Sequence, residues 1–161
     1  MDNLDAVINK VGFEIAKILD ENLINKLLGV LANDGVYAMW IYALNKLKEK
    51  ELLKLLLAIS SFPVQIKDKE RKIIKLENIQ KQIELFKKIN GLKNELKQNK
   101  NNQEIKKELK TKEEEYKNLF AKNYVFFKIL SKDLNQLLFF KELLEKALIY
   151  ARYHAKAMKD E

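Results

Sequence analysis

Residues 76–119 have the sequence LENIQKQIELFKKINGLKNELKQNKNNQEIKKELKTKEEEYKNL, which decides much of the predicted fold. Apolar side chains recur in it at steps of three and four residues, in two series separated by the polar residues 99–102. The series are Leu76, Ile79, Ile83, Phe86, Ile89, Leu92 and Leu96, then Ile105, Leu109, Tyr116 and Leu119. Narrow apolar stripes with charges on both sides are typical of a two-stranded antiparallel coiled coil. The sequence therefore predicts a helical hairpin that projects from the rest of the protein.

Denser apolar patterns precede the hairpin and predict packed helices. The face of the first helix consists of Leu4, Val7, Val11, Ile15 and Ile18. A break is expected near residues 20–22, before a second helix. Residues 36–48 are apolar almost all round, which is typical of the buried centre of a bundle, and Asp34 is the expected N-cap of that helix. Another short helix is expected at 49–59. It should end before Pro63, because the residue that precedes a proline avoids the helical region.

A dense apolar pattern returns after the hairpin. Residues 123–130 are rich in aromatic side chains, residues 131–133 mark a break, and a long helix is expected at 134–158. Only four glycines and one proline occur, and Leu, Lys, Glu, Ile and Ala predominate. This composition favours helices and argues against a turn-rich β-fold.

These patterns predict an all-α fold, namely a compact helical bundle with an inserted antiparallel coiled-coil hairpin. We expect a single domain over residues 1–161, because its length is typical of one domain. The bundle core is expected at about 1–65 and 119–161, and the basic helical hairpin at about 66–118.

The residue types that are missing exclude several classes of chemistry. The absence of cysteine excludes disulfide bonds, thiolate catalysis and cysteine-ligated metals, and a single histidine excludes the usual multi-histidine metal sites. Residues 1–5 lack the basic and apolar regions of a signal peptide. The longest uncharged apolar run has nine residues, whereas about 20 are needed to span a bilayer. We therefore expect a cytoplasmic protein without a cofactor.

The remaining candidates for catalysis or metal binding are few. His154 lies on the expected last helix without a nucleophile beside it, so a structural or surface role is favoured over general-base catalysis. Residues 113–115 are three glutamates that point about 100° apart on a helix and cannot converge on one ion; pairing with neighbouring lysines is expected. Trp40 and Tyr42 are expected to pack in the core rather than to stack on bases. The sequence predicts neither catalytic nor metal-binding residues, and hence no enzyme.

The charge balance favours a polyanionic partner. Lys and Arg number 31 against 23 Asp and Glu, which gives +8, and residues 66–118 alone contribute +6. Ten basic residues surround the first stripe of the expected hairpin: Lys67, Lys69, Arg71, Lys72, Lys75, Lys81, Lys87, Lys88, Lys93 and Lys97. Ten acidic residues lie within the same segment, so solvation of a thin coiled coil is the favoured interpretation of this charge. The one aromatic residue among these lysines, Phe86, belongs to the apolar stripe, which argues against base stacking on the hairpin.

Basic residues on the first and last expected helices are arranged more specifically. On the last helix they lie at nearly one angle beside the apolar stripe, and on the first helix two lysines seven residues apart share a face with Glu14 between them. Arginine suits bidentate contact with phosphate, which favours phosphate binding at these positions. A plain solvated surface explains the same pattern equally well, so both interpretations stay open. The candidate nucleic-acid-binding residues are Lys10, Lys17, Lys141, Arg152 and Lys156.

Several stretches outside the hairpin resemble a known family. They are LANDG (31–35) with the apolar residues 36–44, LSKD (130–133), FFKE (139–142) and RYHAKAM (152–158). Together with the opening helix they resemble the small helical subunit of type III-B (Cmr-type) CRISPR effector complexes, over residues 1–62 and 124–158. The hairpin at about 66–118 exceeds the family's pattern, and His154 stands where an aromatic or apolar residue is expected.

The resemblance implies a non-catalytic protein that acts in antiviral defence. Several copies would stack beside the backbone subunits that hold the guide RNA and would help to line the channel for single-stranded target RNA. Its implied partners are those backbone subunits, copies of itself and the two RNAs, with no membrane and no small-molecule substrate. The basic positions carried over are Lys10 and Lys17 on the first helix and Arg152 and Lys156 on the last.

Two other functions stay open at this stage. The first is a protein-interaction or scaffold module that docks a partner through its coiled-coil hairpin, without nucleic acid. The second is a small DNA-binding protein. Residues 36–44 argue against it, because they are too apolar to form a recognition helix that faces a DNA groove.

Overall fold

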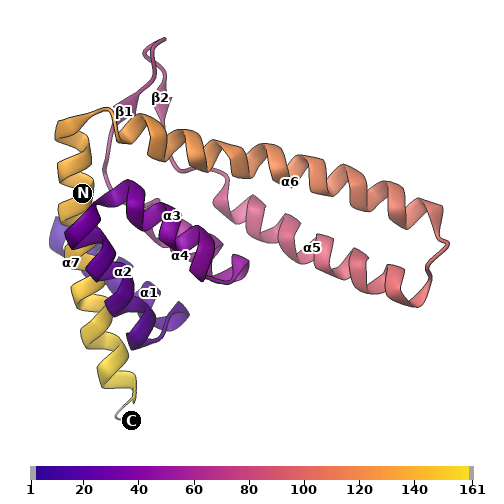
Figure 1. Ribbon diagram of the computed structural model, residues 1–161, viewed down its shortest axis with the longest axis horizontal. Coiled ribbons are helices and arrows are strands. Elements are labelled where there is room, and N and C mark those ends of the chain that lie inside the picture. The colour runs from indigo at the N-terminus through magenta and orange to yellow at the C-terminus, as the bar shows by residue number, and fades with distance from the viewer. Residues whose placement is uncertain (1–2, 160–161) are drawn as a thin grey trace.

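The computed structural model describes residues 3–159, and these are predominantly helical (Figure 1). The all-α prediction is confirmed in outline, with the addition of one two-stranded sheet. Met1 and Asp2, part of the acidic start, lie outside the described residues. The elements in chain order are α1 (Leu4–Ile18), α2 (Glu21–Asp34), α3 (Val36–Lys46), α4 (Glu49–Ile59), β1 (Ile66–Lys67), β2 (Ile73–Ile74), α5 (Ile79–Gln98), α6 (Gln103–Leu130) and α7 (Leu134–Lys159).

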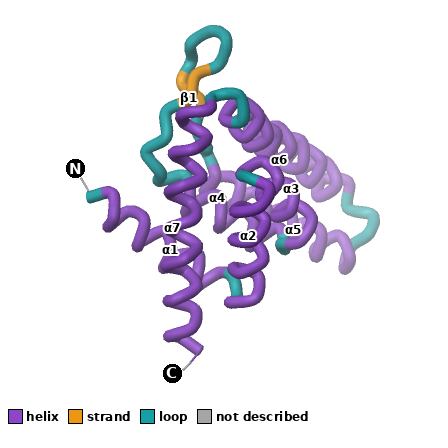
Figure 2. Tube along the Cα trace, turned by 60° about the vertical axis from the view of Figure 1, so that its left-hand side comes forward, coloured by secondary structure: helices purple, strands orange, loops and turns teal. Residues whose placement is uncertain are grey.

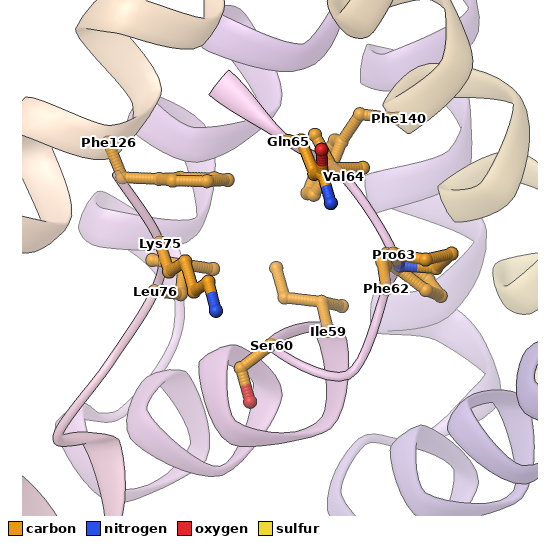
Figure 3. A pocket seen from close by; sticks show the side chains of 10 residues that line it. All are labelled: Ile59, Ser60, Phe62, Pro63, Val64, Gln65, Lys75, Leu76, Phe126 and Phe140. Carbon is orange, nitrogen blue, oxygen red and sulfur yellow. The ribbon is translucent and has the colours of Figure 1, made fainter. Parts of the chain in front are cut away.

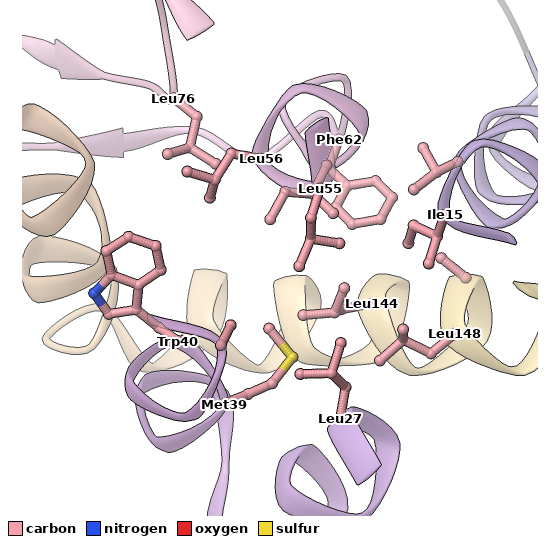
Figure 4. Close-up of a cluster of buried hydrophobic side chains, with 14 of the residues drawn as sticks. Ile15, Leu27, Met39, Trp40, Leu55, Leu56, Phe62, Leu76, Leu144 and Leu148 are labelled. Carbon is pink, nitrogen blue, oxygen red and sulfur yellow. The ribbon is translucent and has the colours of Figure 1, made fainter. Parts of the chain in front are cut away.

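The core of the bundle forms where α7 packs against α1 and α2, and where α4 packs against α1. Ile15, Leu27, Leu55 and Leu144 meet there from four different helices, each with almost no exposed surface (Figure 4). Burying a leucine or isoleucine side chain stabilises a fold by about 1.5–3 kcal/mol, and these four belong to a larger core cluster to which each of the helices contributes buried side chains. The predicted break between the first two helices is confirmed: Asp20 caps α2 by accepting the Leu23 N–H at 2.8 Å.

The third helix differs from its prediction in two respects. Asp34 is the last residue of α2 and does not cap α3; Gly35 occupies the N-cap with φ 95°, a conformation that glycine adopts without strain. The helix is also not the buried centre of the bundle. Trp40 is buried, as predicted, whereas Tyr37 and Ile41 are exposed, because the neighbouring helices cover only part of the circumference of α3.

The prediction that residues 66–78 belong to a basic helical hairpin is wrong. Ile66 pairs with Ile74, and Lys67 with Ile73, in an antiparallel β-hairpin that projects from the body (Figure 2). Asp68 stabilises the turn by accepting the backbone N–H groups of two later residues, Glu70 at 2.8 Å and Lys72 at 2.9 Å. Residues 71 and 78 both have positive φ, which is incompatible with a helix continuing through them.

Helices α5 and α6 run side by side and are joined by residues 99–102, as Figure 1 shows. Two ion pairs link them: the Lys81 Nζ lies 3.1 Å from Glu115 Oε1, and the Lys88 Nζ lies 3.5 Å from Glu108 Oε1. The α6 helix continues without a break from this pair into the bundle, so the expected end of the hairpin near residue 119 falls within one helix. Within residues 3–159, no helix combines the length and the apolar character needed to cross a membrane.

Candidate nucleic-acid interface

Four lysines from three helices surround a groove of about 500 Å³ between α1, α4 and α5. We call it the lysine groove and define it by Lys10 and Lys17 of α1, Lys54 of α4 and Lys87 of α5. The other residues that line it are Val11, Glu14, Ile18, Leu57, Ala58, Ser61, Gln80 and Ile83.

The position of α4 creates this groove. It packs against both α1 and α5, so Leu57 and Ala58 form an apolar floor while the flanking helices provide the walls. Lys10 and Lys17 lie seven residues apart on α1, which is close to two turns, and therefore reach the groove from one wall. Lysine stems cover apolar surface while their ammonium groups remain in water, so an apolar floor with a basic rim is a stable arrangement.

The electrostatics of the lysine groove are positive. Glu14 is the one acidic residue that lines it, against four lysines, which leaves a net charge of +3. Its Oε1 lies 3.6 Å from the Lys17 Nζ, but both side chains are about half exposed, and such surface pairs contribute little free energy. The Lys17 Nζ also lies 4.3 Å from the centroid of the Phe13 ring. A concave surface of one charge sign concentrates counter-ions, here anions such as phosphate.

His154 lies on the neighbouring α7 and contacts α1. Its Nε2 lies 3.0 Å from Asn9 Oδ1, within hydrogen-bonding distance, and its ring meets the Phe13 ring edge-on with centroids 5.3 Å apart. These contacts place His154 in the α1–α7 packing.

The structure does not bring all of the predicted basic residues together. Lys10 and Lys17 share the lysine groove, whereas none of the three candidates on α7 lines it. The Lys141 Nζ lies 3.8 Å from Glu145 Oε1, the Arg152 guanidinium stands 5.7 Å from the ring of the adjacent Tyr153, and Lys156 is exposed.

Sequence reasoning missed two of the four groove lysines. Lys54 is one of two lysines on a short, mostly apolar helix, and Lys87 belongs to a run of charge that is typical of a solvated hairpin. The only available signal was the apolar periodicity of α4 and α5, which shows that both helices bury a face. It does not show that these faces meet beside α1.

Other polar groups in the structure are used in local contacts. Glu115 pairs with Lys112 on its own helix, as predicted, and also with Lys81 of α5, whereas no ion pair of Glu113 or Glu114 is seen among the described residues. Across residues 3–159, no three His, Asp or Glu side chains gather closely enough to hold a metal ion.

A smaller pocket of about 210 Å³ lies at the base of the β-hairpin (Figure 3). Its walls are mostly apolar and include Phe62, Phe126 and Phe140. Lys75 is its one titratable lining residue, and the Ser60 hydroxyl donates to the Leu57 carbonyl at 2.6 Å. The pocket therefore holds no paired acid and base.

No family model matches the chain, and neither the curated proteins nor the solved structures provide a match.

Proposed function

We propose that this protein binds the sugar–phosphate backbone of single-stranded RNA in the lysine groove and acts as a non-catalytic subunit of a larger ribonucleoprotein. The observation that supports this most is the convergence of Lys10, Lys17, Lys54 and Lys87 from three helices on one concave surface. Ammonium groups on flexible stems contact phosphate oxygens without selecting a base. Binding is therefore independent of base sequence and strongly dependent on salt.

The proposed assembly is a type III-B CRISPR effector complex, in which the protein is the small subunit. The stretches that carry the resemblance lie mostly in α3 and α7. Several copies would stack beside the backbone subunits that hold the guide RNA, and each lysine groove would contribute to the channel for the target RNA. Exposed apolar side chains such as Tyr37 and Ile41 support a role within an assembly, because contiguous exposed apolar surface marks interaction sites. A row of copies would bind RNA more tightly than one copy through multivalency.

Groove binding is tested with fluorescently labelled oligouridylate, measured by anisotropy over a series of salt concentrations. We expect the double variant Lys54→Gln/Lys87→Gln to weaken binding and to reduce the slope of log affinity against log salt by about 0.7 for each phosphate that is no longer neutralised. The matched control, Lys106→Gln/Lys107→Gln, removes the same charge from α6 outside the groove and should retain most of the affinity. Equal reductions in both variants would show that net charge, and not the groove, binds the RNA.

Membership of the assembly is tested separately, by purifying the tagged protein from its native host and analysing its partners and RNA. Co-purified guide RNAs of repeat–spacer form, together with larger filament-forming subunits, are the expected result. Recovery of the protein alone, or with one partner and no RNA, would contradict the ribonucleoprotein role.

A second candidate function is a scaffold role for α5 and α6. We propose that these helices form an antiparallel coiled coil, since ion pairs link them and Leu85, Ile89 and Leu92 are buried outside the main core cluster. The pair extends away from the bundle in Figure 1, which leaves its outer half available to a partner helix. This role requires no nucleic acid.

A further inference from the structure

An exposed apolar surface lies where α6 ends and α7 begins, at the side of the β-hairpin. Among the described residues, four of the five large apolar side chains with the highest exposed fractions belong to this region. They are Leu134 (67%), Leu138 (55%), Ile73 (54%) and Val125 (45%). We call this the junction surface. Exposed apolar side chains scattered singly need no explanation, whereas a cluster indicates an interaction site.

The junction surface is concave. A depression of about 960 Å³ is lined by the turn of the β-hairpin and by Val125, Ile129 and Leu134 from α6 and α7. Leu138 lies one helical turn after Leu134 and therefore extends the same face of α7. Ile73 is paired with Lys67 across the β-hairpin, and directly opposed residues of an antiparallel pair share a face. Val125, Ile129 and Leu134 thus line the depression, while Leu138 and Ile73 extend the exposed apolar surface along α7 and the β-hairpin.

Lysines surround these apolar side chains. Lys67 and Lys69 of the hairpin segment and Lys128 and Lys132 near the end of α6 line the depression, and none of them forms an ion pair within residues 3–159. Three acidic residues also line it.

Each of these acidic residues also makes a hydrogen bond or an ion pair nearby. The Asp68 carboxylate accepts two backbone N–H groups of the hairpin turn, and Asp133 accepts the Gln136 N–H at 3.2 Å at the start of α7. Glu70 Oε2 lies 3.8 Å from the Lys72 Nζ. The lining therefore keeps a net charge of +1, and its four lysines form no ion pair among the described residues.

We propose that the junction surface docks an acidic amphipathic helix of another protein. The leucine and valine side chains would contact the apolar stripe of that helix, and the four lysines would contact acidic residues beside the stripe. A concave apolar surface with spaced anchors fits a helix, which is read through residues at i, i+3, i+4 and i+7. RNA is disfavoured because three carboxylates line this depression, against one in the lysine groove, so the net charge of its lining is +1 and not +3.

This inference does not depend on the lysine groove, which lies between other helices. The probe is a fluorescein-labelled peptide that forms a helix with leucine at i, i+3, i+4 and i+7 and glutamate elsewhere. We expect the full-length protein to bind it, and Leu134→Gln/Leu138→Gln to weaken binding by about tenfold or more, given the apolar area removed. Lys128→Gln/Lys132→Gln should weaken binding severalfold, and the difference should shrink at high salt.

The control Ile41→Gln changes an exposed apolar residue on α3 and should leave peptide binding unchanged. A scrambled peptide of the same composition should bind poorly. All substitutions are at exposed positions, and circular dichroism checks that each variant is folded. Equal binding of both peptides, or no effect of Leu134→Gln/Leu138→Gln, overturns the proposal. It is also overturned if the same leucine substitutions abolish binding to anionic phospholipid vesicles or self-association in sedimentation experiments while peptide binding persists.

Discussion

Gly12 lies where α1 crosses the backbone of α7. A Cβ atom at this position would be 2.8 Å from the Ala147 carbonyl oxygen and 2.8 Å from Tyr150 Cβ, closer than real contacts of this kind. The carbonyl belongs to a rigid helix and cannot move aside alone, so the two helices would have to separate. Gly29 in α2 is a natural comparison, because outside the local helix backbone no heavy atom lies within 4 Å of the equivalent Cβ.

We expect Gly12→Ala to lower the free energy of unfolding by about 1–3 kcal/mol through overpacking. Gly29→Ala should raise it by about 0.5–1 kcal/mol, because alanine is the better helix former and no clash opposes it. Urea unfolding followed by circular dichroism measures both values. If the two variants change the free energy of unfolding in the same direction, the close packing of α1 against α7 does not require a glycine at position 12.

At the scale of single residues, the sequence predicted those features that depend on nearby residues in the chain. The break at Asp20 and the burial of Trp40 depend on neighbours within a few positions, and both were predicted. Asp34 was misplaced as a cap because Gly35 takes that position with positive φ. Lys54 and Lys87 were missed because the groove exists only once α1, α4 and α5 have packed, and no spacing in the sequence records that packing.

At the scale of elements, α5 and α6 are joined by a buried pair of amides. The Asn123 Nδ2 donates to Gln82 Oε1 at 2.8 Å, and the Gln82 Nε2 donates in return to Asn123 Oδ1 at 3.3 Å. Both side chains are almost completely buried. Because each amide satisfies the other, the pair fixes the register of the two helices where they leave the bundle.

Replacing one partner leaves the other amide buried without a hydrogen bond. Gln82→Leu alone should therefore lower the free energy of unfolding by about 1–3 kcal/mol, whereas Gln82→Leu/Asn123→Leu should recover much of that stability. A double-mutant cycle by urea denaturation measures the coupling. Strictly additive effects would show that the two amides act independently.

A second contact fastens α6 to the start of α4. The Tyr116 hydroxyl donates to Glu49 Oε1 at 2.6 Å. Burial, together with the hydrogen bond to Glu49 and its negative charge, raises the pKa of Tyr116 far above its ordinary value of 10.0. Above pH 10 the unfolded chain loses this proton while the folded protein keeps it, so the free energy of unfolding must fall as the pH rises.

We expect Tyr116→Phe to reduce this alkaline decrease in stability. Urea denaturation at pH 8 and at a pH above 10 gives the decrease for each protein. Tyr153→Phe is the matched control, since the Tyr153 side chain is mostly exposed, and it should behave like the wild type. A decrease in Tyr116→Phe as large as in the wild type would contradict the contribution of this hydroxyl.

The helices themselves were largely predictable, because three- and four-residue periodicity is a strong local signal. Two features of the elements were not. The β-hairpin at residues 66–74 depends on a turn held by Asp68 and on positive φ at Arg71, in a segment whose lysines suggested a solvated helix. The continuity of α6 was hidden because its outer half has a narrow apolar stripe and its inner half is packed around Trp40.

At the scale of the whole molecule, the proposed RNA-binding and partner-docking surfaces are spatially separate. The lysine groove lies over α4, and the junction surface lies at the β-hairpin beside the start of α7. One copy could therefore hold RNA and a protein partner at the same time, which is what a subunit inside an assembly requires. The α5–α6 pair reaches beyond both surfaces, and its outer half contributes to neither.

Because of this arrangement, one shortened variant with two deletions can distinguish the RNA-binding role from the scaffold role. Removing residues 89–95 and 103–109 takes two turns from each helix next to the connecting residues 99–102, and seven-residue steps preserve the register of an antiparallel pair. Lys87 and the groove remain, as does the Gln82–Asn123 pair.

If the groove carries the function, oligouridylate binding by the shortened protein should stay within about twofold of the wild type, because the groove lysines are unchanged. Native RNA should also still co-purify with it. If the hairpin is the working surface, the shortened protein should lose its partners in the same purification while its isolated fold and RNA affinity stay intact, because the deleted turns lie outside the bundle core.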